Sequence, residues 1–170
     1  MGWQAIKERL RRLFRRHHWQ YIVWHTAAHG NPRTGEVYDT TAAQIDAWHK
    51  AQGWQKIGYH FVVRLNGDLE TGRGLDEIGA HVEGLNRRAI GICFSGHGDL
   101  QPLTDAQVQT GVNLTVALCK AYHIPVHRVL GHRECAEILK RPLFKTCPGK
   151  LVDMRVMRVK IQEVLNALQE

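Results

Sequence analysis

Two histidines and one cysteine stand where their side chains could together hold a metal ion. His25 and His132 each lie at or near the end of a short apolar run, YIVWHTA and VHRVLGH, and strands of this kind present their last side chains at the rim of a sheet. Cys147 lies in KTCPG, where the Pro-Gly pair predicts a loop and the nearby Lys145 favours the thiolate. Two imidazoles and a thiolate, with a fourth position left to water, form the ligand pattern of a catalytic zinc site.

The spacing of these residues leaves a purely structural role open. They are 107 and 15 positions apart, and those intervals match no local zinc motif. The chain has 11 histidines, and five of them have ordinary contexts, namely His17, His18, His49, His123 and His127. Taken by themselves, Tyr59 would be a core or rim aromatic residue and Lys145 a solvated loop charge.

The elements that must position these residues are those of an α/β domain. Apolar runs rich in β-forming residues predict strands at 21–27, 59–65 and 89–96, and Asn66-Gly67 predicts a hairpin back through 68–73. We expect a loop at 29–35 and an extended piece at 126–132. Apolar residues at helical spacing predict helices from Thr40 or Thr41 to about Gln52, from Thr104 to about Tyr122, and from about Asp153 to Leu168.

Composition is that of one folded domain. The 170 residues are 44% hydrophobic and 23% charged, which excludes a disordered, collagen-like or fibrous chain. The four cysteines are interpreted as thiols: Cys93 and Cys119 lie in apolar patterns that favour burial, and the role of Cys135 is left open.

The net charge of +7 is concentrated at the start of the chain. Residues 1–18 carry six basic side chains against Glu8, so 19–170 carries only +2. A basic amphipathic helix is predicted there, with an apolar stripe of Trp3, Ile6, Leu10, Leu13 and Phe14. It would pack on the body, bind an anionic membrane or lipopolysaccharide, or meet a nucleic acid or protein partner. We therefore divide the chain into an extension, 1–18, and a body, 19–170, that carries the candidate metal ligands.

The start of the chain does not match an export signal. Arginines interrupt the apolar segment that a signal peptide requires, and no run approaches the ~18 apolar residues of a membrane span. Synthesis in the cytoplasm without a signal peptide is expected.

Five stretches occur here in one order: YIVWHTA, IGYHFVVRLNGDLETGR, GAHVEGLNRRAIGICFSG, VLGHRE and KTCPG. Together they resemble the zinc-dependent N-acetylmuramoyl-L-alanine amidases of the phage T7 lysozyme type, whose fold is shared by the peptidoglycan recognition proteins. The likeness runs from about Tyr21 to Leu168. It implies a single α/β domain with a central mixed sheet flanked by helices.

The resemblance implies roles for five residues. His25, His132 and Cys147 match the family's Zn²⁺ ligands, and Tyr59 and Lys145 match its catalytic residues. Trp24 and Ala27-Ala28 depart from the family's pattern around the first strand, so the wall of the cleft is expected to differ in detail from that of the family. His60 is expected on the opposite strand face from Tyr59, and His81 and Asn86 are candidates to line the substrate groove.

The implied activity is hydrolysis of the amide bond between N-acetylmuramic acid and L-alanine of the peptidoglycan stem peptide. An endolysin of this kind would be a monomer acting on the cell wall in the periplasm after release, or in the host cytoplasm. One alternative is a module that binds peptidoglycan without cutting it. Another is an amidase that also binds and regulates a phage RNA polymerase, as T7-type lysozymes do.

Overall fold

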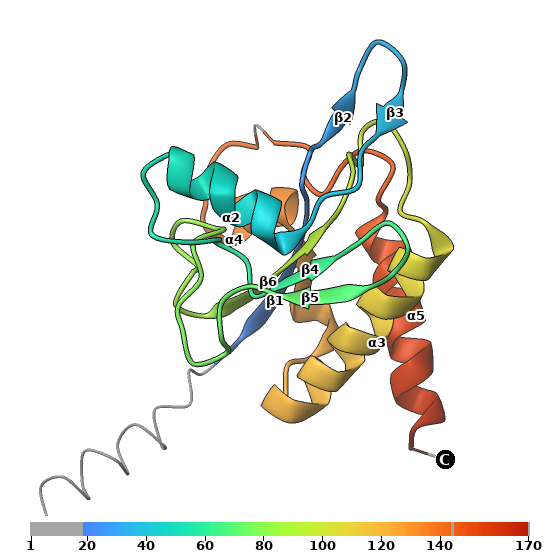
Figure 1. Cartoon of the computed structure of the whole chain (residues 1–170). Coiled ribbons are helices and arrows are strands. Elements are labelled where there is room, and N and C mark those ends of the chain that lie inside the picture. The colour runs from blue at the N-terminus through green and yellow to red at the C-terminus, as the bar shows by residue number, and fades with distance from the viewer. Residues whose placement is uncertain (1–18, 144, 170) are drawn as a thin grey trace, which may run out of the picture.

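The computed structural model describes residues 19–143 and 145–169. They form a five-stranded mixed sheet with helices on both faces, and a separate hairpin of β2 (Gly30–Asn31) and β3 (Glu36–Val37) extends beyond it (Figure 1). The expected α/β class with a mixed sheet is confirmed. The basic helix predicted at 1–18 lies outside the described residues.

The strands of the sheet bring distant parts of the chain to one edge. Their order is β5-β4-β6-β1-β7, and they are β1 (Tyr21–Thr26), β4 (Phe61–Val63), β5 (Leu69–Thr71), β6 (Ala89–Phe94) and β7 (Val129–Gly131). All are parallel except β5, which returns antiparallel to β4. His25 pairs with Cys93, and Trp24 pairs with Gly131, the residue before His132. The carboxyl ends of β1, β6 and β7 therefore meet at the edge that carries two of the predicted ligands.

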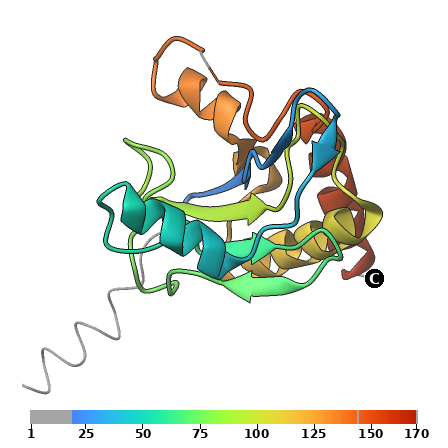
Figure 2. The same cartoon turned by 45° about the horizontal axis from the view of Figure 1, so that its top comes forward.

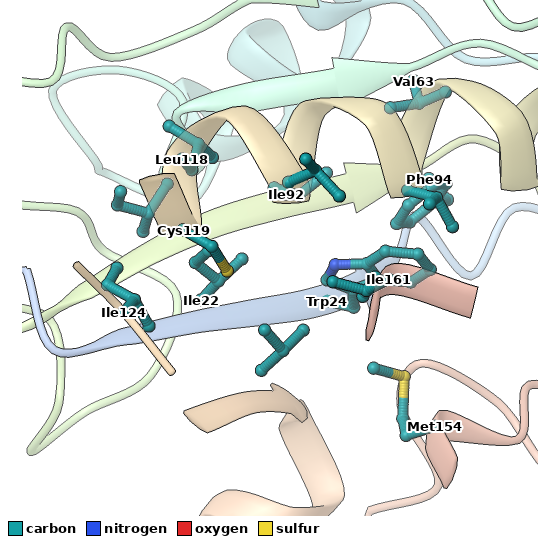
Figure 3. Close-up of a cluster of buried hydrophobic side chains, with 14 of the residues drawn as sticks. Ile22, Trp24, Val63, Ile92, Phe94, Leu118, Cys119, Ile124, Met154 and Ile161 are labelled. Atoms are coloured by element: carbon teal, nitrogen blue, oxygen red, sulfur yellow. The ribbon is translucent and has the colours of Figure 1, made fainter. Parts of the chain in front are cut away.

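One face of the sheet is packed with large apolar side chains. Helices α3 (Asp105–Tyr122) and α5 (Met154–Ala167) cover this face, and Figure 3 shows their side chains meeting those of the strands. The Trp24 indole is fully buried and donates from Nε1 to Thr115 Oγ1 of α3 over 3.1 Å. The main cluster includes Ile22, Trp24, Ile90, Ile92, Phe94, Val112, Val116 and Ile161.

The opposite face carries small residues and imidazoles. The alternate residues of β6 are Ala89, Gly91 and Cys93, all fully buried. Helix α2 (Ala42–Ala51) covers part of this face, on the other side of the sheet from α3 and α5 (Figure 2). Space left by the small side chains is occupied by the buried rings of His60 and His81, against which a Cβ at Gly91 or Gly79 would clash.

The predicted helix starts are confirmed in detail. Thr41 caps α2 and Thr104 caps α3, each by accepting from the backbone N–H three residues on in a capping box. Helix α2 ends at Ala51 before Gly53, whose φ of +89° suits glycine. In the ranges that the structure describes, none of the helices is long and apolar enough to cross a membrane.

Three extended segments differ from expectation. The strand predicted at 59–65 is only Phe61–Val63, because the Leu65 N–H donates to the Asp39 carboxylate instead of continuing the ladder. The extended piece predicted at 126–132 is strand only at Val129–Gly131, since a 3₁₀ turn follows Pro125 and another begins at His132. The loop predicted at 29–35 contains β2, and the short helix α4 (Cys135–Ile138) was not predicted.

All four cysteines are free thiols, as expected. Cys93 and Cys119 are buried, as their apolar surroundings indicated. Cys135 is also buried, and its thiol donates to the Gly131 carbonyl over 3.7 Å. Cys147 differs from the other three because it is partly exposed.

Candidate metal centre

His25, His132 and Cys147 come together at the carboxyl edge of the sheet. Their candidate ligand atoms all lie within 4.8 Å of one another, and His25 Nδ1 is 3.7 Å from Cys147 Sγ. Zinc binds nitrogen at about 2.0 Å and sulfur at about 2.3 Å, which separates tetrahedral N and S ligands by about 3.6 Å. The donor set and its spacing therefore fit a zinc ion.

The position of His132 is set by a hydrogen-bonded turn at the end of β7. The Glu134 carboxylate accepts from the Gly131 N–H over 2.8 Å and from both terminal nitrogens of Arg158 over 2.9 Å. Because Gly131 and Glu134 flank His132 and Arg133, this arrangement ties the turn to α5.

Arg133 links the His132 turn to the loop that carries Cys147. Its backbone N–H donates to the Cys147 carbonyl over 2.7 Å. Its guanidinium donates to three carbonyls of the same loop, those of Thr146, Gly149 and Val152, over 2.6 to 3.0 Å. The two segments that bring His132 and Cys147 are thus held as one unit.

Two further contacts fix the Cys147 loop against the sheet. Thr26, the residue after His25, donates from Oγ1 to the Pro148 carbonyl over 2.9 Å. Asp99 accepts from Thr146 Oγ1 and from the Lys150 N–H, each over 2.7 Å. These side chains leave the loop with a defined path although it has no regular secondary structure.

Burial keeps the imidazoles of the site neutral. It lowers the pKa of His132 to about 4, and the Lys145 charge acts in the same direction. Burial, together with the neighbouring His81 and His132, also lowers the pKa of His25 well below its ordinary value. A neutral imidazole has the lone pair that a metal ligand needs.

The thiol of Cys147 is more protonated than the sequence suggested. Burial raises its pKa to about 11 in the metal-free protein, although a backbone hydrogen bond from Thr26 and the Lys145 charge lower it. Lys145 favours the thiolate, as expected, but desolvation outweighs this nearby cation in the metal-free state. A bound metal ion would supply the missing stabilisation of the thiolate.

Tyr59 lies against the ligand cluster. Its ring centroid is 5.0 Å from that of His25, and burial, followed by the effects of Cys93 and Cys147, raises the pKa of its hydroxyl well above 10. The hydroxyl therefore keeps its proton and can donate a hydrogen bond. The expected separation of Tyr59 and His60 onto opposite strand faces was wrong. Both rings lie beside His81, at centroid distances of 6.3 and 5.9 Å, because β4 begins only at Phe61.

A cavity of about 330 Å³ opens beside the cluster. Lys145 lies at its wall, where its charge is felt by His25 and His132. His81 and Asn86, candidates for a groove, both line it. Other walls are formed by Trp54, Glu83, Arg141 and Leu143.

Sequence reasoning missed the contact that His81 makes with the ligand cluster. His81 Nδ1 lies 3.0 Å from His25 Nε2, and His81 Nε2 lies 3.0 Å from the Ala89 carbonyl. Burial lowers the pKa of His81 to about 3, so this ring is neutral. The only signal of this contact in the sequence was that His81 lies in the stretch GAHVEGLNRRAIGICFSG, which resembles the amidase family.

An α/β sheet with a His-His-Cys cluster and a half-buried tyrosine beside a cavity is typical of a metal-dependent hydrolase. The sequence profile of the N-acetylmuramoyl-L-alanine amidases matches residues 15–150, and the chain belongs to this family.

Known relatives agree with this assignment. The chain is 35% identical over 121 residues to an endolysin of Klebsiella phage KP32, covering 68% of this chain and 74% of that protein. It is 36% identical over 111 residues to the endolysin of Escherichia phage T7, covering 62% and 68%. Among solved structures, the N-acetylmuramoyl-L-alanine amidase LysC of Clostridium intestinale superposes with a TM-score of 0.70 at 27% identity, over 86% of this chain and 88% of that one.

Proposed function

We propose that this protein is a zinc-dependent N-acetylmuramoyl-L-alanine amidase that cuts the bond between the lactyl group of N-acetylmuramic acid and the first L-alanine of the stem peptide. The observation that carries the proposal is the convergence of His25, His132 and Cys147 beside a cavity in a chain of the amidase family.

These three residues would hold the metal. Two neutral imidazoles and one thiolate would leave a Zn²⁺ centre at net +1, a charge that further thiolates would remove. Zinc at this position would supply Lewis acidity for the scissile carbonyl and lower the pKa of water to about 7. The loop contacts of Arg133 and Asp99 would keep the ligand geometry fixed during the reaction.

Tyr59 and Lys145 would act on the substrate. The attacked carbonyl oxygen becomes an oxyanion, and a protonated tyrosine hydroxyl and an ammonium group are both suited to stabilise it. The high pKa of Tyr59 favours a role as hydrogen-bond donor. Either residue could also pass a proton to the leaving amine of L-alanine, which must be protonated before it departs.

The cavity would accept the muropeptide. Trp54 offers an aromatic surface, and Glu83 and Arg141 offer opposite charges at the rim, so the cavity suits a ligand with both sugar and charged peptide parts. Because His25, His132 and Cys147 are all present, the site favours hydrolysis over recognition alone.

As an endolysin, the enzyme would act on the cell wall after release from the cytoplasm. The basic segment 1–18 would bring it to an anionic membrane or lipopolysaccharide surface. Deleting 1–18 should leave digestion of purified sacculi intact and abolish lysis of intact cells. Equal lysis by both forms would remove this role.

Product analysis tests the proposal. Purified sacculi are digested with the zinc-loaded protein or with Cys147→Ala, and mass spectrometry searches for free stem peptides that begin with L-alanine. We expect these peptides from the parent protein alone. Sacculi that are bound without release of stem peptides would instead support a recognition module.

A further inference from the structure

His81 bonds to a predicted metal ligand, and the direction of that bond can be deduced. The Ala89 carbonyl, 3.0 Å from His81 Nε2, can only accept a hydrogen bond, so Nε2 carries the proton. In the neutral ring Nδ1 is then the acceptor. It faces His25 Nε2 at 3.0 Å, so His25 must donate from Nε2.

The same chain of bonds selects the metal-binding atom of His25. If Nε2 of the neutral ring carries the proton, Nδ1 keeps the free lone pair, and Nδ1 is the atom 3.7 Å from Cys147 Sγ. The opposite tautomer would point an N–H at the sulfur and leave two acceptors facing each other across the His25–His81 contact. The structure therefore favours one tautomer for both rings.

The protein is built to hold the His81 ring in this orientation. A Cβ at Gly91 would lie 2.7 Å from His81 Cγ and Cδ2, and one at Gly79 would lie 2.6 Å from Cδ2. The ring therefore lies in a slot that requires glycine at both positions. The Asn86 side chain accepts from the backbone N–H groups of His81 and Val82, each over 2.8 Å, and fixes the loop that enters the slot.

We propose that His81 is a positioning residue that sets the tautomer of His25, so that Nδ1 of His25 is presented to zinc. The inference rests on the zinc site of the proposed function. Metal-binding histidines commonly donate their other ring nitrogen to an outer partner, which fixes the ring. Here that partner is a neutral imidazole, so the outer partner adds no negative charge to the centre.

His60 provides a matched control. It is buried on the same face, and its ring nitrogens bond to the backbone instead, with Nδ1 accepting from the Gly91 N–H and Nε2 facing the Glu77 carbonyl, each at 3.0 Å. Replacing either histidine by leucine removes a buried imidazole of the same size. His25 loses its acceptor only in His81→Leu.

The test measures zinc affinity by chelator competition, with Zn²⁺ alone as the probe. We expect His81→Leu to weaken zinc binding by about 10–100-fold. In His81→Asn the amide oxygen can take the place of Nδ1 as the acceptor, so binding should stay close to that of the parent, as it should in His60→Leu. Equal affinity of His81→Leu and the parent, or an equal loss in both leucine variants, would overturn the proposal.

Nitrogen NMR of the parent's histidine rings tests the tautomer directly, even if His81→Leu does not fold. The metal-free protein should show His25 and His81 both protonated at Nε2. His25 protonated at Nδ1 would overturn the proposal. A parent that folds but binds no zinc would instead refute the proposed function, so the two failures are distinguishable.

Discussion

The two faces of the central sheet are formed by the same strands but carry different kinds of side chain. In β6, Ile90, Ile92 and Phe94 fill the face under α3 and α5, whereas Ala89, Gly91 and Cys93 leave space on the other. One face gains its stability from apolar burial. The other gives up apolar volume and holds hydrogen-bonded imidazoles instead, so the comparison separates residues that stabilise the fold from residues that build the site.

Removing the thiolate ligand should have the largest effect on activity. Cys147→Ala is expected to lower amidase activity by about 10³-fold or more, because the loss of one of three ligands disrupts the zinc site. The free energy of unfolding in chelator should change by no more than about 1 kcal/mol, since Cys147 is partly exposed.

Three measurements test whether Cys147→Ala loses activity without losing stability: activity on sacculi, zinc content and denaturant unfolding. Cys119→Ala, on the apolar face, is the control and should keep its zinc. Full zinc content in Cys147→Ala would contradict the assignment of the ligand.

Tyr59→Phe should act on the reaction without acting on the metal. The phenyl ring keeps the packing against His25, but the hydroxyl donor is lost, and kcat should fall by about 10²–10³-fold. Zinc content and stability should match the parent. Tyr38→Phe, whose ring lies against His29, should leave kcat unchanged. An unchanged kcat in Tyr59→Phe would remove the hydroxyl from the reaction.

A substitution on the apolar face should lower stability and leave activity unchanged. Ile92→Ala, one residue from Cys93, should lower the free energy of unfolding by about 2–5 kcal/mol because it opens a cavity in the core. Amidase activity per folded molecule and zinc affinity should be retained. If the folded variant lost zinc as well, the two faces would not be separable.

Acid should destabilise the metal-free protein through the site face. The folded-state pKa values of His81, about 3, and His132, about 4, lie below the ordinary 6.5, so the unfolded chain binds more protons as the pH falls. Stability should decline as the pH falls from about 6.5 toward 4. The slope should be up to about 1.4 kcal/mol per pH unit for each ring, and less for the partly exposed His132.

Denaturant unfolding in chelator between pH 7.5 and 5 measures this slope. His81→Asn should make it shallower, since His81 is gone while His25 and His132 still titrate. A slope that is the same in His81→Asn and the parent would assign the acid sensitivity to other groups.

Much of the fold was predictable because its signals are local. Alternating or continuous apolar runs predicted β1 and β6, and the caps at Thr41 and Thr104 predicted where α2 and α3 begin. The end of β4 was not predictable, because Asp39, distant in sequence, accepts from the Leu65 N–H in place of the ladder.

The candidate site was predictable only in part. The structure brings together His25, His132 and Cys147, while their roles and those of Tyr59 and Lys145 stay predictions. The supporting contacts of Arg133 and His81 could not be read from periodicity. Arg133 lies in a short 3₁₀ turn and His81 in a loop, and their partners are fixed only by the packing of distant segments.

Titration of the metal-free protein with zinc during sacculus digestion tests the central claim most directly. New L-alanine amino termini should rise in proportion to added zinc and level off at one equivalent, with none formed by Cys147→Ala. Full release in the presence of chelator, or new reducing sugars in place of amino termini, would contradict a zinc amidase at this edge of the sheet.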